Sequence, residues 1–241
     1  MSPMCRCVFH RLGFSRSWVA ASWLLAFSIG LCPSVLGAPL EHYRYRQTTG
    51  NSVKNLDWRL EKDDPYRLVA DIGAERDITR VDDLLATTSW KVTDPVANTD
   101  LMVWREGNLL QIEGRFKGET IREHRKIDAA PWYQALSISL RPLVDFPQRD
   151  LAFWSLRPDT LEAHKLRVAS GGEEVFDILG QKTTVVKLEI RLTGFKSMLW
   201  KCHYWLRKSD GLFLRYEGPS GPPGWPLTRV TLAESEPGAD R

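Results

Sequence analysis

The chain has 241 residues and a formal net charge of +3, but the first 38 residues contain three arginines and no acid. Subtracting these three from the 33 Lys and Arg leaves 30 basic against 30 acidic side chains in residues 39–241. A balanced surface creates no long-range field toward a phosphate backbone, and no run of Lys and Arg forms a stripe along one. We therefore expect no nucleic-acid partner.

Residues 1–38 have the three-part pattern of a secretory signal peptide. Three arginines precede an uncharged apolar run over 18–31, which is followed by Cys32, Pro33 and a small-residue stretch over 34–38. The run has 14 residues, fewer than the roughly 20 that a helix needs to cross a bilayer. An uncleaved membrane anchor is therefore the weaker alternative, and a leucine before Cys32 argues against lipid attachment. The pattern predicts export to the periplasm, with the exact cleavage site left open.

The cysteine count excludes an internal disulfide in the exported part, because Cys202 is its only cysteine. Cys202 lies in an apolar, aromatic-flanked stretch over 199–205, where a small buried side chain is the expected role. A reactive thiol or an intermolecular partner is the alternative. About 200 residues bury a core without such cross-links. We expect one domain over 39–233, followed by a disordered tail over 234–241.

Residues 42–126 show the two-residue alternation of apolar and polar side chains that is typical of half-buried strands. Turn residues separate these segments, including Asp63-Asp64-Pro65 and Glu106-Gly107-Asn108. The segments are joined in chain order, so they predict a meander. The expected strands are 42–46, 56–60, 66–70, 88–92, 101–105, 109–112 and 119–126.

One helix is predicted between Asp128 and Val144. Asp128 can cap it, Pro131 suits a first helical turn, and apolar residues from Trp132 to Leu140 fall near helical spacing. The β-branched and serine residues of this stretch are modest helix formers, so packing must stabilise the helix.

The second half returns to strand signals, with Gly171-Gly172, Gly180-Gln181-Lys182 and Ser209-Asp210-Gly211 as expected turns. A Pro- and Gly-rich loop is predicted over 218–226. We expect a mainly β fold, in which a curved antiparallel sheet, an incomplete β-barrel, wraps around one central helix. The expected strands are 151–156, 165–169, 174–179, 183–192, 200–207, 212–216 and 227–232.

No catalytic or metal-binding motif stands out. The histidines of the exported part lie outside any metal-ligand spacing, and they are His42, His124, His164 and His203. No Gly-x-Ser-x-Gly turn or phosphate-binding glycine loop is present, and Cys202 and His203 would point to opposite faces of one strand. We expect no catalytic residue, metal or cofactor, and therefore no enzyme. An active site assembled from distant residues is the third-ranked alternative.

Tryptophan is the distinctive residue, with eight in residues 39–241. One interpretation is ordinary core, because aromatic residues favour pleated surfaces. The other is that a curled sheet too wide to fill leaves an apolar cavity, lined by these rings and covered by the helix. On the second interpretation, the ligand-binding wall or lid residues are Trp104, Trp132, Trp154, Trp200 and Trp205.

The C-terminal third contains Gly-Glu-Glu-Val at 172–175, Lys-Leu-Glu at 187–189 and Tyr-Trp-Leu-Arg-Lys-Ser-Asp-Gly-Leu-Phe-Leu-Arg-Tyr-Glu-Gly-Pro at 204–219. Over residues 150–232 this order resembles uncharacterised exported β-proteins of proteobacteria, related to the LolA/LolB-like lipoprotein-carrier half-barrel superfamily. The motif describes a hairpin, in which Asp210-Gly211 makes a tight turn between two strands of the concave wall. The resemblance implies a curved sheet with helix cover, and ligand or lipoprotein handling such as outer-membrane lipoprotein sorting. It supplies no catalytic residues, and fold analogy alone is a weak argument for function.

Two functions remain open at this point. The first is a periplasmic binding or carrier protein for an apolar ligand, such as a lipid or a lipoprotein acyl chain, with transient membrane contact. The second is a cell-envelope interaction module with a filled core, which docks a protein partner through a sheet edge or through the 218–226 loop with its Trp225. A cavity beneath the helix distinguishes the two.

Overall fold

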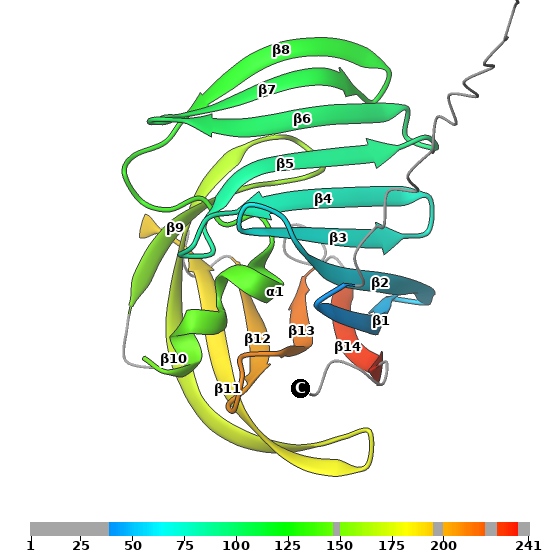
Figure 1. The fold of residues 1–241 in the computed structure, drawn as a ribbon, viewed down its shortest axis with the longest axis vertical. Coiled ribbons are helices and arrows are strands. Elements are labelled where there is room, and N and C mark those ends of the chain that lie inside the picture. The colour runs from blue at the N-terminus through cyan, green and yellow to red at the C-terminus, as the bar shows by residue number, and fades with distance from the viewer. Residues whose placement is uncertain (1–38, 147–149, 195–199, 220–225, 236–241) are drawn as a thin grey trace, which may run out of the picture. The chain divides into compact units, whose positions relative to one another are not determined.

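Fourteen strands form one antiparallel sheet, in the order β8-β7-β6-β5-β4-β3-β2-β1-β14-β13-β12-β11-β10-β9 (Figure 1). The computed structural model describes residues 39–146, 150–194, 200–219 and 226–235. The expected signal peptide, the centre of the 218–226 loop with Trp225, and the chain after 235 lie outside the described residues. Because β1 pairs with β14, the two meanders join in the middle of the sheet, and β8 and β9 are its outermost strands. The predicted fold class, an incomplete barrel, is confirmed.

Seven of the first eight strands were predicted, and β4 was not. Residues Asp77 and Thr79 occupy inward positions of β4, and Arg76 and Arg80 occupy outward ones. Neither face of this strand is apolar, so the alternation that identifies its neighbours is missing. The bounds are β1 (Glu41–Thr49), β2 (Ser52–Lys62), β3 (Tyr66–Ile72), β4 (Glu75–Val81), β5 (Thr87–Asp94), β6 (Thr99–Glu106), β7 (Leu109–Phe116) and β8 (Glu119–Lys126).

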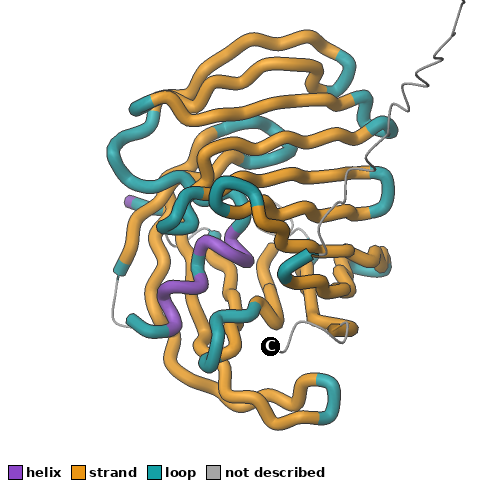
Figure 2. Tube along the Cα trace, in the orientation of Figure 1, coloured by secondary structure: helices purple, strands orange, loops and turns teal. Residues whose placement is uncertain are grey.

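The second meander contains a long hairpin, and the first strand of this hairpin was predicted as two shorter strands and a turn. The expected turn at Gly171-Gly172 is wrong, because the chain continues through it as a single strand with a register shift between Ser170 and Gly172. Gly172 has a φ of +95°, which suits a bulge and bends the strand. Figure 2 shows the resulting curl of this hairpin. The bounds are β9 (Leu151–Leu156), β10 (Ala163–Ile178), β11 (Gln181–Leu192), β12 (Lys201–Arg207), β13 (Phe213–Pro219) and β14 (Leu227–Ser235).

The predicted helix over 128–144 is wrong in its extent. The described chain has a short helix α1 (Leu136–Ser139) and a 3-10 helix η1 (Arg141–Val144), and the residues between Ile127 and Ala135 are not helical. Their backbone groups bind two strands: Thr87 N–H donates to the Trp132 carbonyl, and Tyr133 N–H donates to the Trp154 carbonyl, each at 2.8 Å. Backbone N–H and C=O groups that bind these strands are not available for the hydrogen bonds of a helix. Asp128 caps the N–H of Ala130 at 2.9 Å and does not cap the helix.

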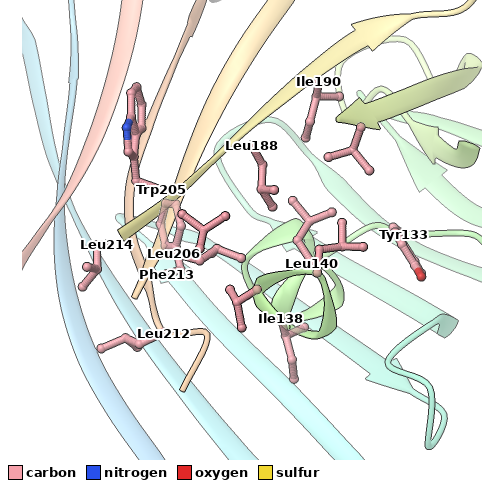
Figure 3. Packing of buried hydrophobic residues seen from close by; sticks show 14 of the residues in the cluster. Tyr133, Ile138, Leu140, Leu188, Ile190, Trp205, Leu206, Leu212, Phe213 and Leu214 are labelled. Atoms are coloured by element: carbon pink, nitrogen blue, oxygen red, sulfur yellow. The ribbon is translucent and has the colours of Figure 1, made fainter. Parts of the chain in front are cut away.

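Residues 130–144, called the inner segment below, lie on the concave side of the sheet (Figure 1). Ile138 and Leu140 of this segment are at most 1 % exposed and belong to the same cluster as Leu188, Leu206 and Phe213 (Figure 3). A second cluster lies under β5–β8, around Trp90, Ile112 and Trp132. Cys202 is buried in the first cluster, as predicted. Within the described ranges, no helix reaches the length and apolarity that crossing a bilayer requires.

Candidate functional site

The concave side of the sheet contains a cavity of about 290 Å³. Strands β1–β5 form one wall and β12–β14 form the other, while the inner segment contributes residues 134–137. The apolar and aromatic lining residues are Leu56, Trp58, Leu68, Ala70, Ile72, Trp90, Ala135, Leu136, Pro158, Tyr204, Phe213, Tyr216 and Val230. The polar ones are Gln47, Asp77, Thr79, Gln134, Ser137 and Thr228. The concave side therefore has a hollow that is partly open to solvent, next to two packed clusters.

The cavity exists because small side chains occupy inward positions between large rings. Ala70 on β3 pairs with Trp58 on β2 and with Asp77 on β4, so a methyl group stands where neighbouring strands place larger side chains. Trp58 and Trp90 are each 2 % exposed and frame this gap. Since inward positions recur every second residue, the spacing of each strand fixes which side chains face the hollow.

Hydrogen bonds fix both indole rings at the cavity wall. Trp58 Nε1 donates to the hydroxyl oxygen of Ser137 at 3.1 Å, and Trp90 Nε1 donates to Oδ1 of Asp77 at 3.1 Å. Buried indoles commonly satisfy their N–H group in this way. The first bond also connects the sheet to the inner segment, so the two sides of the cavity are linked directly.

Asp77 is the only carboxyl group among the lining residues. The pKa of Asp77 is raised to about 7, mainly by burial and also by the charge of Glu75, while the hydrogen bond from Trp90 acts in the opposite direction. The other ionisable lining groups are the phenols of Tyr204 and Tyr216, and burial raises the pKa of each above its ordinary value. Asp77 is therefore the lining group whose charge changes near neutral pH.

A partly buried ion pair connects the inner segment to β1. Arg141 Nη1 and Nη2 donate to the two carboxylate oxygens of Glu41, each at 2.7 Å. The two side chains are 15 % and 22 % exposed, and the guanidinium also lies 5.4 Å from the Trp58 ring centroid. Such bidentate pairs add geometric precision as well as energy. The ion pair therefore holds the inner segment in place next to the cavity.

The five tryptophans predicted to form the wall or lid are not among the lining residues of this cavity. Trp132 is fully buried in the second cluster, where its Nε1 donates to Gln134 Oε1 at 3.1 Å. Trp154 Nε1 donates to Asp128 Oδ1 at 2.8 Å, with Lys165 Nζ 5.8 Å from its ring. Trp200 is partly buried against the first cluster.

The remaining two lie on the outward face of the sheet. Val103 pairs with the inward Trp90, so the next residue, Trp104, faces outward. Trp205 points away from α1 in Figure 3, and its Nε1 donates to Glu174 Oε2 at 2.9 Å. The curl of the β10–β11 hairpin brings Glu174 there, which explains why Trp205 is buried although it faces outward.

Sequence reasoning missed Trp58 and Trp90, although a signal for Trp58 was present. Trp58 shares its face of β2 with Leu56 and Leu60, so alternation alone marks it as inward. The role of Trp90 depends on Asp77, and the strand that carries Asp77 was not predicted. Among the residues that the structure describes, no group of three or more His, Cys, Asp or Glu is placed to hold a metal ion.

The sheet, the inner segment and the cavity define a β-barrel-like protein with an open sheet and a hollow interior. The chain resembles a β-barrel-like protein of the domain of unknown function DUF1849 from Brucella abortus, with a TM-score of 0.53, 10 % identity, and coverage of 83 % of this chain and 98 % of the other. This likeness concerns the fold alone.

Two further solved structures are similar at lower scores. The hypothetical lipoprotein YmcC from Escherichia coli has a TM-score of 0.37 and 11 % identity, and covers 81 % of this chain and 85 % of its own. A LolA superfamily protein from Nitrosomonas europaea has a TM-score of 0.27 and 7 % identity, with coverage of 83 % and 88 %. No family model and no curated protein sequence matches the chain.

Proposed function

We propose that this protein binds or carries an apolar ligand, such as a lipid or an acyl chain of a lipoprotein, in the cavity between the inner segment and the sheet. The observation that carries the proposal is the cavity of about 290 Å³, whose walls are mainly aliphatic and aromatic. Ligand pockets typically measure about 300–1,000 Å³ and combine apolar walls with a few placed polar groups. The cavity matches this description at its lower limit.

The volume of the cavity suggests that it holds a single acyl chain. At about 30 Å³ for each water-sized group, it has room for about ten such groups. Each buried methylene contributes about 0.8 kcal/mol, so a chain of medium length gains enough free energy for binding at micromolar concentration. A whole diacyl lipid would exceed this space unless the walls moved.

The alternative function, an envelope interaction module, assumed a filled interior. The hollow next to Trp58 and Trp90 favours a ligand over that alternative. We also propose a binding role in preference to catalysis, because the lining residues contain a single carboxyl group, Asp77, and no histidine or cysteine. We further propose that the protein is periplasmic and contacts membranes transiently, since an apolar chain must be collected from a membrane or from a lipidated protein.

Titration of the delipidated protein with a fluorescent fatty acid tests this function. We expect saturable binding of one molecule per chain, with displacement by a non-fluorescent acyl ester. Ala70→Phe places a ring in the cavity and should abolish binding. Ala169→Phe is the matched control, because Ala169 is exposed on β10. Absence of uptake at micromolar concentration, or equal binding by the two variants, would contradict the proposal.

A further inference from the structure

Asp77 presents a carboxyl oxygen to the cavity. Its backbone lies between Ala70 of β3 and Val92 of β5, both on the inward face. Oδ1 accepts the hydrogen bond from Trp90, and among the described residues Oδ2 has no hydrogen-bond partner. Asp77 is only half-buried and lines the cavity, so Oδ2 is accessible from it. A group in a ligand can therefore reach this oxygen.

The surroundings of Asp77 contain few charges. On β4, Glu75 lies two residues away on the same face, and its own pKa is raised by burial and by Asp94 of β5 and lowered by Lys54 of β2. Asp71 on β3 and Arg76 on β4 are also charged, but their side chains lie on the outward face of the sheet.

The other elements around the cavity add no charge near Asp77. The inner segment contributes Gln134 and Ser137, and strands β12 and β13 contribute the phenols of Tyr204 and Tyr216. No lysine or arginine is among the lining residues, so no cation in the cavity stabilises the carboxylate. Near neutral pH a large share of Asp77 therefore keeps its proton, because burial raises its pKa to about 7.

We propose, on the basis of the function proposed above, that protonated Asp77 donates a hydrogen bond to an uncharged oxygen acceptor on an acyl ligand, and that rising pH releases this ligand. An ester carbonyl fits this chemistry. A carboxylic acid kept neutral by an apolar site is an effective hydrogen-bond donor. When Asp77 loses its proton, the donor becomes an acceptor, and a buried charge faces both the carbonyl and the acyl chain.

The affinity for methyl decanoate, measured at two pH values, tests this inference. If only the protonated form binds, the Kd should be about 30-fold higher at about pH 8.5 than at about pH 6, because the competent fraction falls by that factor around a pKa of about 7. Decylamine should show the opposite trend and bind more tightly at the higher pH, because its ammonium group pairs only with the ionised carboxylate. An affinity for methyl decanoate that rises with pH would overturn the proposal.

Two variants separate Asp77 from the rest of the site. Asp77→Asn keeps a hydrogen-bond donor of the same shape and cannot titrate, so its Kd for methyl decanoate should be equal at both pH values and close to the wild-type value at low pH. Glu75→Gln is the matched control, because Glu75 lies outside the lining residues. It should keep the pH dependence with a lower midpoint, since the charge of Glu75 raises the pKa of Asp77.

The outcomes distinguish this inference from the function on which it rests. Wild-type binding that is equal at both pH values, or an Asp77→Asn variant that keeps the wild-type pH dependence, would overturn the role of Asp77 and leave the carrier function standing. Absence of binding for every probe at both pH values would refute the carrier function, and the inference with it.

Discussion

Replacing Asp77 by asparagine is expected to stabilise the ligand-free protein at about pH 8 and to leave its stability nearly unchanged at about pH 4. In the unfolded chain Asp77 titrates near its ordinary pKa of 3.8, whereas in the folded protein its pKa is about 7. Between these values the folded state holds a proton that the unfolded state has lost. Stability therefore falls as the pH rises through this window, and asparagine removes the loss.

The magnitude follows from the size of this pKa difference. A difference of about 3 units, at 1.36 kcal/mol for each, gives about 4 kcal/mol as an upper limit above pH 7. Because Asp77 is only half-buried and faces a cavity that solvent can enter, we expect about 2–4 kcal/mol. Urea unfolding of the wild type and of Asp77→Asn at both pH values measures this difference in the free energy of unfolding.

Asp71→Asn is the control with the opposite sign. Hydrogen bonds from Arg76 and Arg59, together with their charges, lower the pKa of Asp71 in the folded protein. Its stabilising contribution is present at neutral pH and is lost as the pH falls through the folded-state pKa. Asp71→Asn should therefore destabilise the protein at about pH 8 and have little effect at low pH. If Asp77→Asn behaved in the same way as this control, the account of Asp77 as a desolvated acid would be refuted.

Three further predictions concern the cavity, the backbone and the thiol. Ala70→Leu adds about three methylene-sized groups to the cavity, so an acyl chain that fills the wild-type cavity should lose about 2.4 kcal/mol of binding free energy, roughly 60-fold in Kd. A chain three carbons shorter should lose little, and calorimetry measures both affinities. Equal losses for the two chains would contradict the packing argument. Gly114 has a φ of +131°, and an added Cβ would lie 2.3 Å from the Asp100 carbonyl oxygen, so Gly114→Ala should cost about 2–4 kcal/mol in denaturant unfolding. Gly73→Ala, with φ +65° and nothing within 4 Å, should cost only about 1 kcal/mol. Burial raises the pKa of the Cys202 thiol, so a thiol reagent should label it only at the rate of unfolding; rapid labelling of the native protein would show that the site is open.

Much of the fold could be predicted from local patterns. Strands such as β2 and β6 carry a clear apolar face, and Gly107-Asn108 closes the hairpin between β6 and β7 as predicted. The inner segment could not be predicted as it is, because the spacing of its apolar residues suits a helix. Its backbone hydrogen bonds go to Thr87 and Trp154, and these long-range partners outweigh local preference.

The candidate site was harder to predict because it departs from the rules that identify strands. Strand β4 places Asp77 and Thr79 where an apolar side chain is normal, so it lacks a strand signal at the position that gives the cavity its polar group. Functional sites are where such departures are expected. To predict which of the eight tryptophans line the cavity, one must know which face of the sheet each side chain lies on. The local sequence determines this only in part. Trp205 shows why, since a distant hairpin buries it on the outward face.

We propose that an acyl chain lies between Trp58 and Trp90. The most direct measurement is a proton–nitrogen correlation spectrum of the tryptophan indoles, recorded while methyl decanoate is added and assigned with single Trp→Phe variants. We expect the indole N–H signals of Trp58 and Trp90 to shift to saturation at one ligand per chain, while those of Trp104 and Trp205 stay unchanged. Saturable binding that leaves the Trp58 and Trp90 signals in place would contradict it.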